Sequence, residues 1–453
     1  MNDAITETKT RDYRKRNRIL YIIEAALEYF ASISVSGAYL ACLTTAIGIS
    51  DALTGVLTSF VSLGCGFQIL AVLLKGNVKR NVTILHLINE TAFTLLYVTP
   101  FFPVSSTVKT VIFTALMLIG FALNNVANPP KTDRFMQSVD KGKRGVFTAN
   151  KEIVSLASGM AFSLMLGYVI DGFKAAGNER GAFAVCGAVL GLITVLHSLT
   201  IIFSKDLPEQ SKAQTKDLSE QSEEQTNEAR EELAETSEET KKAPKRGGLK
   251  AALRDKNLLK VVGTIALWRI VQYSTVPFYG TYQIKELGFS MVFVSVLSIV
   301  YAVVRAVFER PIGRLADKKG FATALNVCYL AEIAALAVAV FMRPENGAVT
   351  YTIHYVLFAI CSAGISSGEL NLTYDYVCED ERVAALAIKA TAGGLIGFLT
   401  TLALSPLVAY IQARGLTIFG VNVYAQQVTS FIGLVFAVIL VIYNTIVVKK
   451  IKR

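Results

Sequence analysis

The chain has 453 residues, of which 53% are hydrophobic and 18% charged, and its mean hydropathy is +0.46. This composition excludes an ordinary soluble protein, in which about a quarter of the residues are charged. The net charge of +10 does not indicate nucleic-acid binding, because Lys and Arg gather at the ends of apolar segments rather than in one patch. The six cysteines are scattered without CxxC spacing, which indicates buried side chains and neither disulfides nor a metal.

Apolar segments of about 20 residues recur along the whole chain, and each is long enough to cross a hydrocarbon core of roughly 30 Å. Backbone polar groups in lipid must be paired within their own segment, so every segment is expected to be a helix. The sequence therefore predicts an all-α integral membrane protein with twelve transmembrane helices. The predicted segments are 19–47, 52–74, 82–102, 107–128, 149–171, 182–204, 258–283, 289–309, 321–342, 350–377, 388–412 and 425–448.

One break in composition, at 205–257, divides the chain into two halves. Its acidic part is dense in Glu, Gln, Ser and Thr and cannot bury enough apolar surface to fold as a domain, so a cytoplasmic linker is expected. Its basic part could lie against anionic lipid headgroups. The predicted domains are an N-terminal tail at 1–18, a six-helix bundle at 19–204, a second at 258–448 and a basic tail at 449–453.

Basic residues also predict the topology. They cluster before the first segment, after the second and fourth, after the eighth, and at the C-terminus. The bias of Lys and Arg toward cytoplasmic loops places both termini in the cytoplasm, as an even number of spans requires. We expect a multi-pass protein of the plasma membrane that acts as a monomer.

The two halves resemble each other in sequence. R-G-V-F-T-A-N-K at 144–151 recurs as R-V-A-A-L-A-I-K at 382–389, which sets the two arginines 238 residues apart (382−144). Glu90 and Glu332 are 242 apart (332−90). Each match is weak alone, but the nearly constant offset predicts two pseudo-symmetric six-helix bundles.

The stretch from Arg305 to Gly320, R-A-V-F-E-R-P-I-G-R-L-A-D-K-K-G, lies between two apolar segments, and we expect a tight turn there. Its second half resembles the cytoplasmic loop motif of the major facilitator superfamily, whose members are secondary transporters, normally with twelve helices in two six-helix halves. Topology alone also explains basic residues in such a turn. The resemblance implies a gating role for Gly313, Arg314, Asp317, Lys318 and Lys319.

Charged residues within the apolar segments are candidates for function, because a charge near the bilayer centre costs at least about 2.5–3.5 kcal/mol. Glu24 and Glu28 share one face of the first helix, with Glu28 roughly 14 Å deep. In the family that the chain resembles, the first, fourth, seventh and tenth helices line a central cavity. The expected cavity residues are Glu24, Glu28, Tyr29, Asn124, Asn125, Trp268, Arg269, Gln272, Tyr273, Glu369 and Asn371.

These residue types suggest roles. Glu24 and Glu28 could exchange a proton, while Arg269 could hold an anionic substrate or pair with Glu28 in an empty site; a fixed ion network of these three is the alternative. Trp268 could stack on a substrate or could pack in the core. For Glu90, with its counterpart in the other half, we expect a shared structural role, such as capping a neighbouring helix.

The sequence thus favours a secondary active transporter that moves a small polar or anionic solute by alternating access, driven by protons and without a cofactor. No enzymatic activity is expected, and the chain has no Walker A loop for ATP. Two alternatives stay open: a drug or metabolite efflux antiporter, and a non-transporting membrane sensor. The fifth helix has glycines at 158–167 but lacks the Gly-Pro pair of many family drug exporters.

Overall fold

The computed structural model describes residues 2–74, 76–140, 143–205, 254–376, 382–418 and 420–451, so most of the expected linker lies outside the described residues. The described chain is almost entirely helical. The first half comprises α1 (Asn2–Ser34), α2 (Gly37–Ile47), α3 (Asp51–Thr58), α4 (Phe60–Phe67), η1 (Gln68–Leu73), α5 (Val78–Val98), η2 (Thr99–Phe101), α6 (Ser106–Met136), α7 (Arg144–Ala175) and α8 (Glu179–Phe203). The second comprises α11 (Lys256–Thr281), η4 (Tyr282–Glu286), α12 (Met291–Lys319), α13 (Phe321–Val340), α14 (Gly347–Tyr376), α15 (Arg382–Arg414), the antiparallel strands β1 (Thr417–Ile418) and β2 (Val421–Asn422), α16 (Ala425–Tyr443) and η6 (Asn444–Val448).

All twelve predicted segments overlap helical structure. Within the described ranges, nine helices are long and apolar enough to cross a membrane, and α1 with α2, bent by 44°, makes a tenth. The predicted segment 52–74 is broken into the short elements α3, α4 and η1. The predicted segment 258–283 corresponds to α11, whose polar side chains lower its hydropathy, and it is not among these nine helices.

Two helices run further than the sequence predicted. We expected a turn across the stretch that begins at Arg305, but α12 continues through Pro311 to Lys319, and the chain reverses at Gly320 alone, with φ 84°. Glycine adopts this left-handed conformation without steric cost. Likewise α6 continues through two prolines to Met136, so Lys131, expected in a cytoplasmic loop, lies within the helix.

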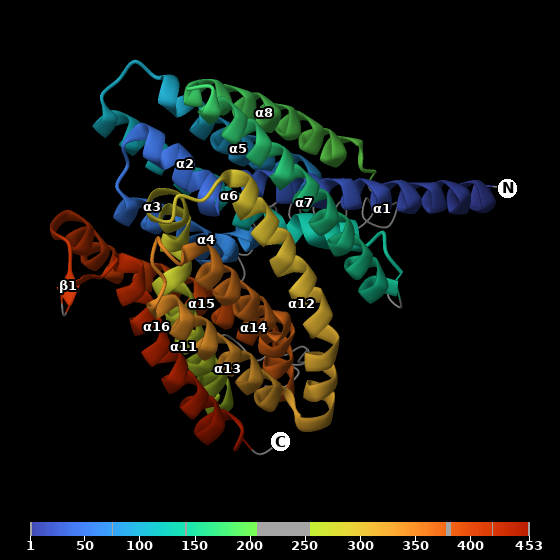
Figure 1. Ribbon diagram of the computed structural model, residues 1–453. Helices are drawn as coiled ribbons and strands as arrows, with labels where there is room; N and C mark the ends of the chain where they lie inside the picture. The colour runs from blue at the N-terminus through green and yellow to red at the C-terminus, as the bar shows by residue number, and fades with distance from the viewer. Residues whose placement is uncertain are drawn as a thin grey trace, which may run out of the picture.

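Each half has its own apolar core. Leu40, Leu57 and Met117 are fully buried in the first half, and Tyr329 and Leu336 are fully buried in the second. Figure 1 shows the halves as two groups of helices, coloured blue to green and yellow to red, with α12 alongside α7. The core of the first half also takes in Met291 and Val294 at the start of α12, so the two cores meet at one end.

Hydrogen bonds join the halves at the end of the molecule that carries β1 and β2, the start of α3 and the start of α12, which we call the hairpin end. Here the Tyr39 hydroxyl of α2 lies 2.9 Å from Oγ of Ser295 in α12. The Asp171 carboxylate of α7 accepts hydrogen bonds from the backbone N–H groups of Met291 (2.9 Å) and Val292 (2.8 Å). Asp171 thereby satisfies two donors at the start of α12, which have no partner within that helix.

A close backbone approach accompanies these bonds. A Cβ atom at Gly280 of α11 would lie 2.4 Å from the carbonyl oxygen of Gly37, which has a positive φ of 53°. Real side chains do not tolerate so short a contact with backbone, so only glycine allows α11 to cross the start of α2 at this distance.

We predict that Gly280→Ala lowers the free energy of unfolding by about 1–3 kcal/mol, because the added methyl group must displace backbone. Chemical denaturation in detergent measures the effect. Gly172→Ala in α7 is the matched control, since a Cβ there has open space around it, and its stability should stay equal or rise slightly. Equal stability of the two variants would contradict the close approach.

Candidate functional site

Lys131 of α6 is the centre of a buried ion cluster in the first half. Its Nζ lies 2.6 Å from Oε1 of Glu24 and 2.8 Å from Oε2 of Glu28, both on α1. The side chains of Lys131 and Glu24 are 1% and 0% exposed, whereas that of Glu28 is 29% exposed. A buried ion is tolerated only when it is paired, and Lys131 is paired twice. Glu28 is therefore the accessible edge of a cluster that is otherwise enclosed.

The cluster continues to α8 and α5 through His197. Nε2 of His197 lies 3.0 Å from Oε1 of Glu24, and its Nδ1 contacts Oε1 of Glu90. The ring of His86 lies 5.0 Å, centroid to centroid, from that of His197. Glu90, expected to cap a neighbouring helix, here meets a histidine side chain instead.

The second half has a separate charged pair. Nη2 of Arg269 in α11 lies 3.1 Å from Oε2 of Glu369 in α14, and its Nη1 donates to Oε1 of Gln272 at 2.8 Å. Glu369 is 5% exposed and Arg269 is 28% exposed. The suggested pairing of Glu28 with Arg269 is corrected, because each is paired within its own half.

Aromatic candidates mostly pack against neighbouring helices. Trp268 is 2% exposed, and its ring lies 5.8 Å from that of Tyr329, so in this conformation it belongs to the core of the second half. The ring of Tyr29 fills the space that a side chain at Gly159 of α7 would need, and Tyr273 does the same at Gly397 of α15. The glycines thus allow close helix packing.

The amide candidates bond locally. Asn125 donates to the carbonyl oxygen of Phe121 at 2.9 Å, and Asn371 donates to that of Ser367 at 2.9 Å, each one turn back in its own helix. Asn124 is half-buried on α6.

The residues of the expected gating motif lie on the last turns of α12 rather than in a loop. Arg314, Asp317, Lys318 and Lys319 are exposed. Gly313 is half-buried, and a side chain there would have open space around it.

A second polar cluster closes the hairpin end. Asp51 at the start of α3 pairs with Lys285 of η4 and accepts a hydrogen bond of 2.8 Å from Gln412 of α15. Gln412 also donates to Glu286 at 3.4 Å. Burial raises the pKa of Glu286 to about 7, which places its ionisation in the physiological range.

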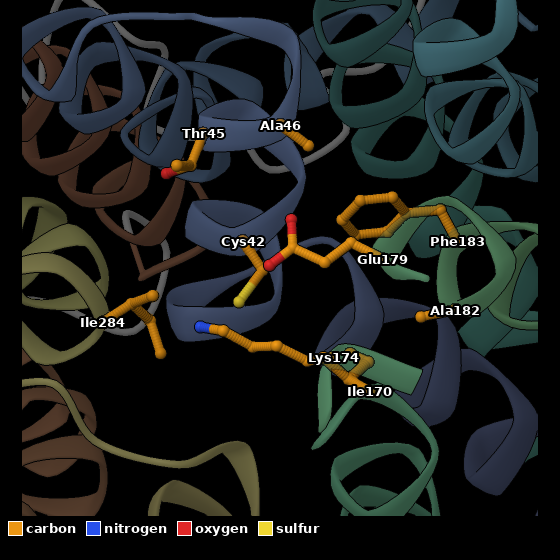
Figure 2. Close-up of a pocket in the computed structure, with 9 residues that line it drawn as sticks. All are labelled: Cys42, Thr45, Ala46, Ile170, Lys174, Glu179, Ala182, Phe183 and Ile284. Carbon is orange, nitrogen blue, oxygen red and sulfur yellow. The ribbon is translucent and has the colours of Figure 1, made fainter. Parts of the chain in front are cut away.

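One small cavity, of about 60 Å³, lies between the first half and η4 near this end. Figure 2 shows Lys174 and Glu179 reaching toward Cys42 of α2, with Ile284 of η4 on the opposite wall. Ligand pockets for organic solutes measure about 300–1,000 Å³, so this cavity holds water at most.

Sequence reasoning missed the basic members of the first cluster. Two prolines precede Lys131 and indicated a helix end, because a residue before proline avoids the helical conformation. His197 gives a signal of its own, as a histidine near the middle of an apolar segment, but its partners come from helices far away in sequence. Asp171 gives no signal, since a carboxylate at a helix end is common.

Comparisons with known proteins place the fold. The model of the Major Facilitator Superfamily matches residues 22–401. Among solved structures, a D-xylose-proton symporter has a TM-score of 0.68 at 13% identity and covers 95% of this chain and 97% of its own. The nucleoside transporter NupG has a TM-score of 0.64 at 13% identity, covering 97% and 100%. A bacterial homologue of the human lysosomal transporter Spinster, in an inward-facing and unoccupied conformation, has a TM-score of 0.63 at 13% identity, covering 95% and 96%. No curated protein matches the chain. The predicted fold class is confirmed.

We predict that Lys131→Met destabilises the protein by about 3–5 kcal/mol, because it leaves buried carboxylates without their counter-ion. Adding Glu24→Gln should recover part of this loss. Denaturation of both single variants and of the double variant gives the coupling energy. Additive losses would show that Lys131 and Glu24 do not interact as described.

We predict that the hairpin end loosens as the pH rises. Glu286 has a pKa of about 7 in the closed arrangement, and opening hydrates it and returns the pKa toward about 4.3. Between these values the closed form binds more protons, so raising the pH from about 4.5 to 7 weakens closure. Spin-label distances between Thr107 and Ala413, in a cysteine-free background, measure the effect. In Glu286→Gln the distances should not respond to pH; an unchanged response there would assign it to another group.

Proposed function

Because the chain belongs to the Major Facilitator Superfamily, we propose that it is a secondary active transporter that moves a small anionic solute with protons by alternating access. It works as a monomer in the plasma membrane with both termini in the cytoplasm. The basic residues at the end opposite the hairpin end support this orientation. The hairpin end is then extracellular.

The observation that carries the proposal is the opposite arrangement of charge in the two halves. In the first half, a buried cation, Lys131, holds a partly exposed anion, Glu28. In the second, a buried anion, Glu369, holds a partly exposed cation, Arg269. Each half therefore presents a partly exposed charge that a transported species can compete for.

Glu28 suits the proton. A proton on Glu28 ends one of the two ion pairs of Lys131 while the other, to the fully buried Glu24, remains. Glu28 can thus gain and lose charge without leaving Lys131 unpaired. Glu24, enclosed between Lys131 and His197, is the fixed member of the cluster.

Arg269 suits the anion. Its planar guanidinium can bind two oxygens of a carboxylate or phosphate side by side. A solute anion at Arg269 competes with Glu369 and Gln272, which hold it at 3.1 and 2.8 Å. One anion with one proton gives a neutral load, which reduces the cost of carrying charge across the bilayer.

The contacts at the hairpin end support alternating access. They include hydrogen bonds and an ion pair, which water can replace when the halves separate, beside apolar contacts of Met291 and Val294 with the first half and of Ala52 with the second. The gating motif on α12 lies at the opposite end. We propose that it braces that end in the other conformation.

The test is uptake by the purified protein in proteoliposomes, with a panel of nucleosides, sugars and organic anions. We expect accumulation that collapses with a protonophore. Glu28→Gln should lower gradient-driven accumulation at least tenfold and keep solute exchange between equal concentrations. Glu345→Gln, in an exposed turn, is the matched control.

Arg269→Gln should raise KM for anionic solutes more than tenfold and leave neutral solutes less affected. Accumulation of cargo driven by an outward-directed proton gradient would instead favour an efflux antiporter. Binding without flux under any gradient would favour a sensor.

A further inference from the structure

Three ionisable side chains lie together in the core of the first half, where His197 and Glu24 connect them to Lys131. His86 and Glu90 are one turn apart on α5, and His197 faces them from α8. They are 1%, 3% and 0% exposed. One nitrogen or oxygen atom from each residue lies within 4.8 Å of the others.

His86 lacks the partners that a buried imidazole requires. Neither of its ring nitrogens has a hydrogen-bond partner, although the residue is enclosed. Oε2 of Glu90 is likewise buried without one. Leaving such groups unpaired costs about 1–3 kcal/mol each, so the site fits an additional species that accepts their lone pairs.

The charge of the surroundings indicates a cation. Glu24, Glu28 and Glu90 bring three negative charges, and Lys131 brings one positive charge. With neutral histidines the cluster keeps two negative charges inside an apolar bundle. One divalent cation balances them, and two imidazole nitrogens with a carboxylate form a common ligand set for zinc and similar metals.

The second ring nitrogen of His197 is also arranged as in metal sites. Nε2 of His197 lies 3.0 Å from Glu24, whose carboxylate is held at 2.6 Å by Lys131. A histidine that binds metal through one nitrogen usually donates the other N–H to a carboxylate, which fixes the tautomer. Glu24 would thus fix the tautomer in which Nδ1 of His197, which here contacts Oε1 of Glu90, carries the lone pair that a metal takes.

We propose that His86, Glu90 and His197 bind one divalent transition metal of the zinc class. The second oxygen of Glu90 or a water completes four-fold coordination at about 2.0–2.2 Å. The metal joins α5 to α8 and, through His197 and Glu24, to α1. It is a resident ion of the bundle rather than cargo, because all three ligands are enclosed in one half. The inference does not depend on the proposed cargo. Protonation of Glu28 in the proposed coupling leaves the three ligands unchanged and removes one negative charge from the surroundings.

The test uses the full-length protein in detergent, stripped with a chelator, incubated with ZnCl₂ and desalted. Elemental analysis should find about one zinc per chain, and zinc should raise the Tm. His86→Ala and Glu90→Gln should each hold less than about a fifth of the wild-type zinc and lose the Tm shift. The matched control is His354→Ala, which removes a buried histidine from the second half and should keep the metal.

Binding of Co²⁺ adds a measurement that needs no variant. Visible absorption of a tetrahedral nitrogen and oxygen site should appear with wild-type protein and disappear on adding zinc. Wild-type protein without zinc above the detergent blank, or variants that retain it, would overturn the proposal. The cluster would then be balanced by protons on its histidines.

Discussion

A buried ammonium between two carboxylates organises the first half of this protein. Lys131 ties α6 to α1 through Glu24 and Glu28, and Glu24 extends the connection to His197 of α8. None of these charges is stable in an apolar bundle without the others, so their positions are fixed together. The partly exposed Glu28 is consequently held in one place, which a transport site needs from its charged groups.

The second half uses the same principle with the signs exchanged. Glu369 is buried and Arg269 is its more accessible partner. Most of each apolar core belongs to one half, and at the hairpin end the halves meet through polar contacts together with buried apolar residues such as Met291 and Ala52. Rigid halves with replaceable bonds between them suit a protein whose proposed work is to open alternately at its two ends.

The sequence predicted the fold well because its signals are local or repeated. The length of each apolar segment indicates a helix, and the offset between Glu90 and Glu332 indicates duplication. Partners across helices were less predictable, because depth in the membrane can be counted along the chain but helix rotation cannot. Arg269 was therefore matched by depth to Glu28, whereas its neighbour is Glu369. Lys131 was missed because helix α6 tolerates two prolines that usually mark an end.

The bonds between Asp171 and the first N–H groups of α12 bear on how evenly the two arrangements are balanced. A helix start that a carboxylate satisfies when the halves meet is satisfied by solvent when they part, so these two bonds favour neither state strongly. Nearly isoenergetic states respond to small differences in ligand affinity. The apolar contacts beside these bonds, such as those of Met291 and Val294 with the core of the first half, add to the cost of separation, and the binding of cargo must offset them before this end can open.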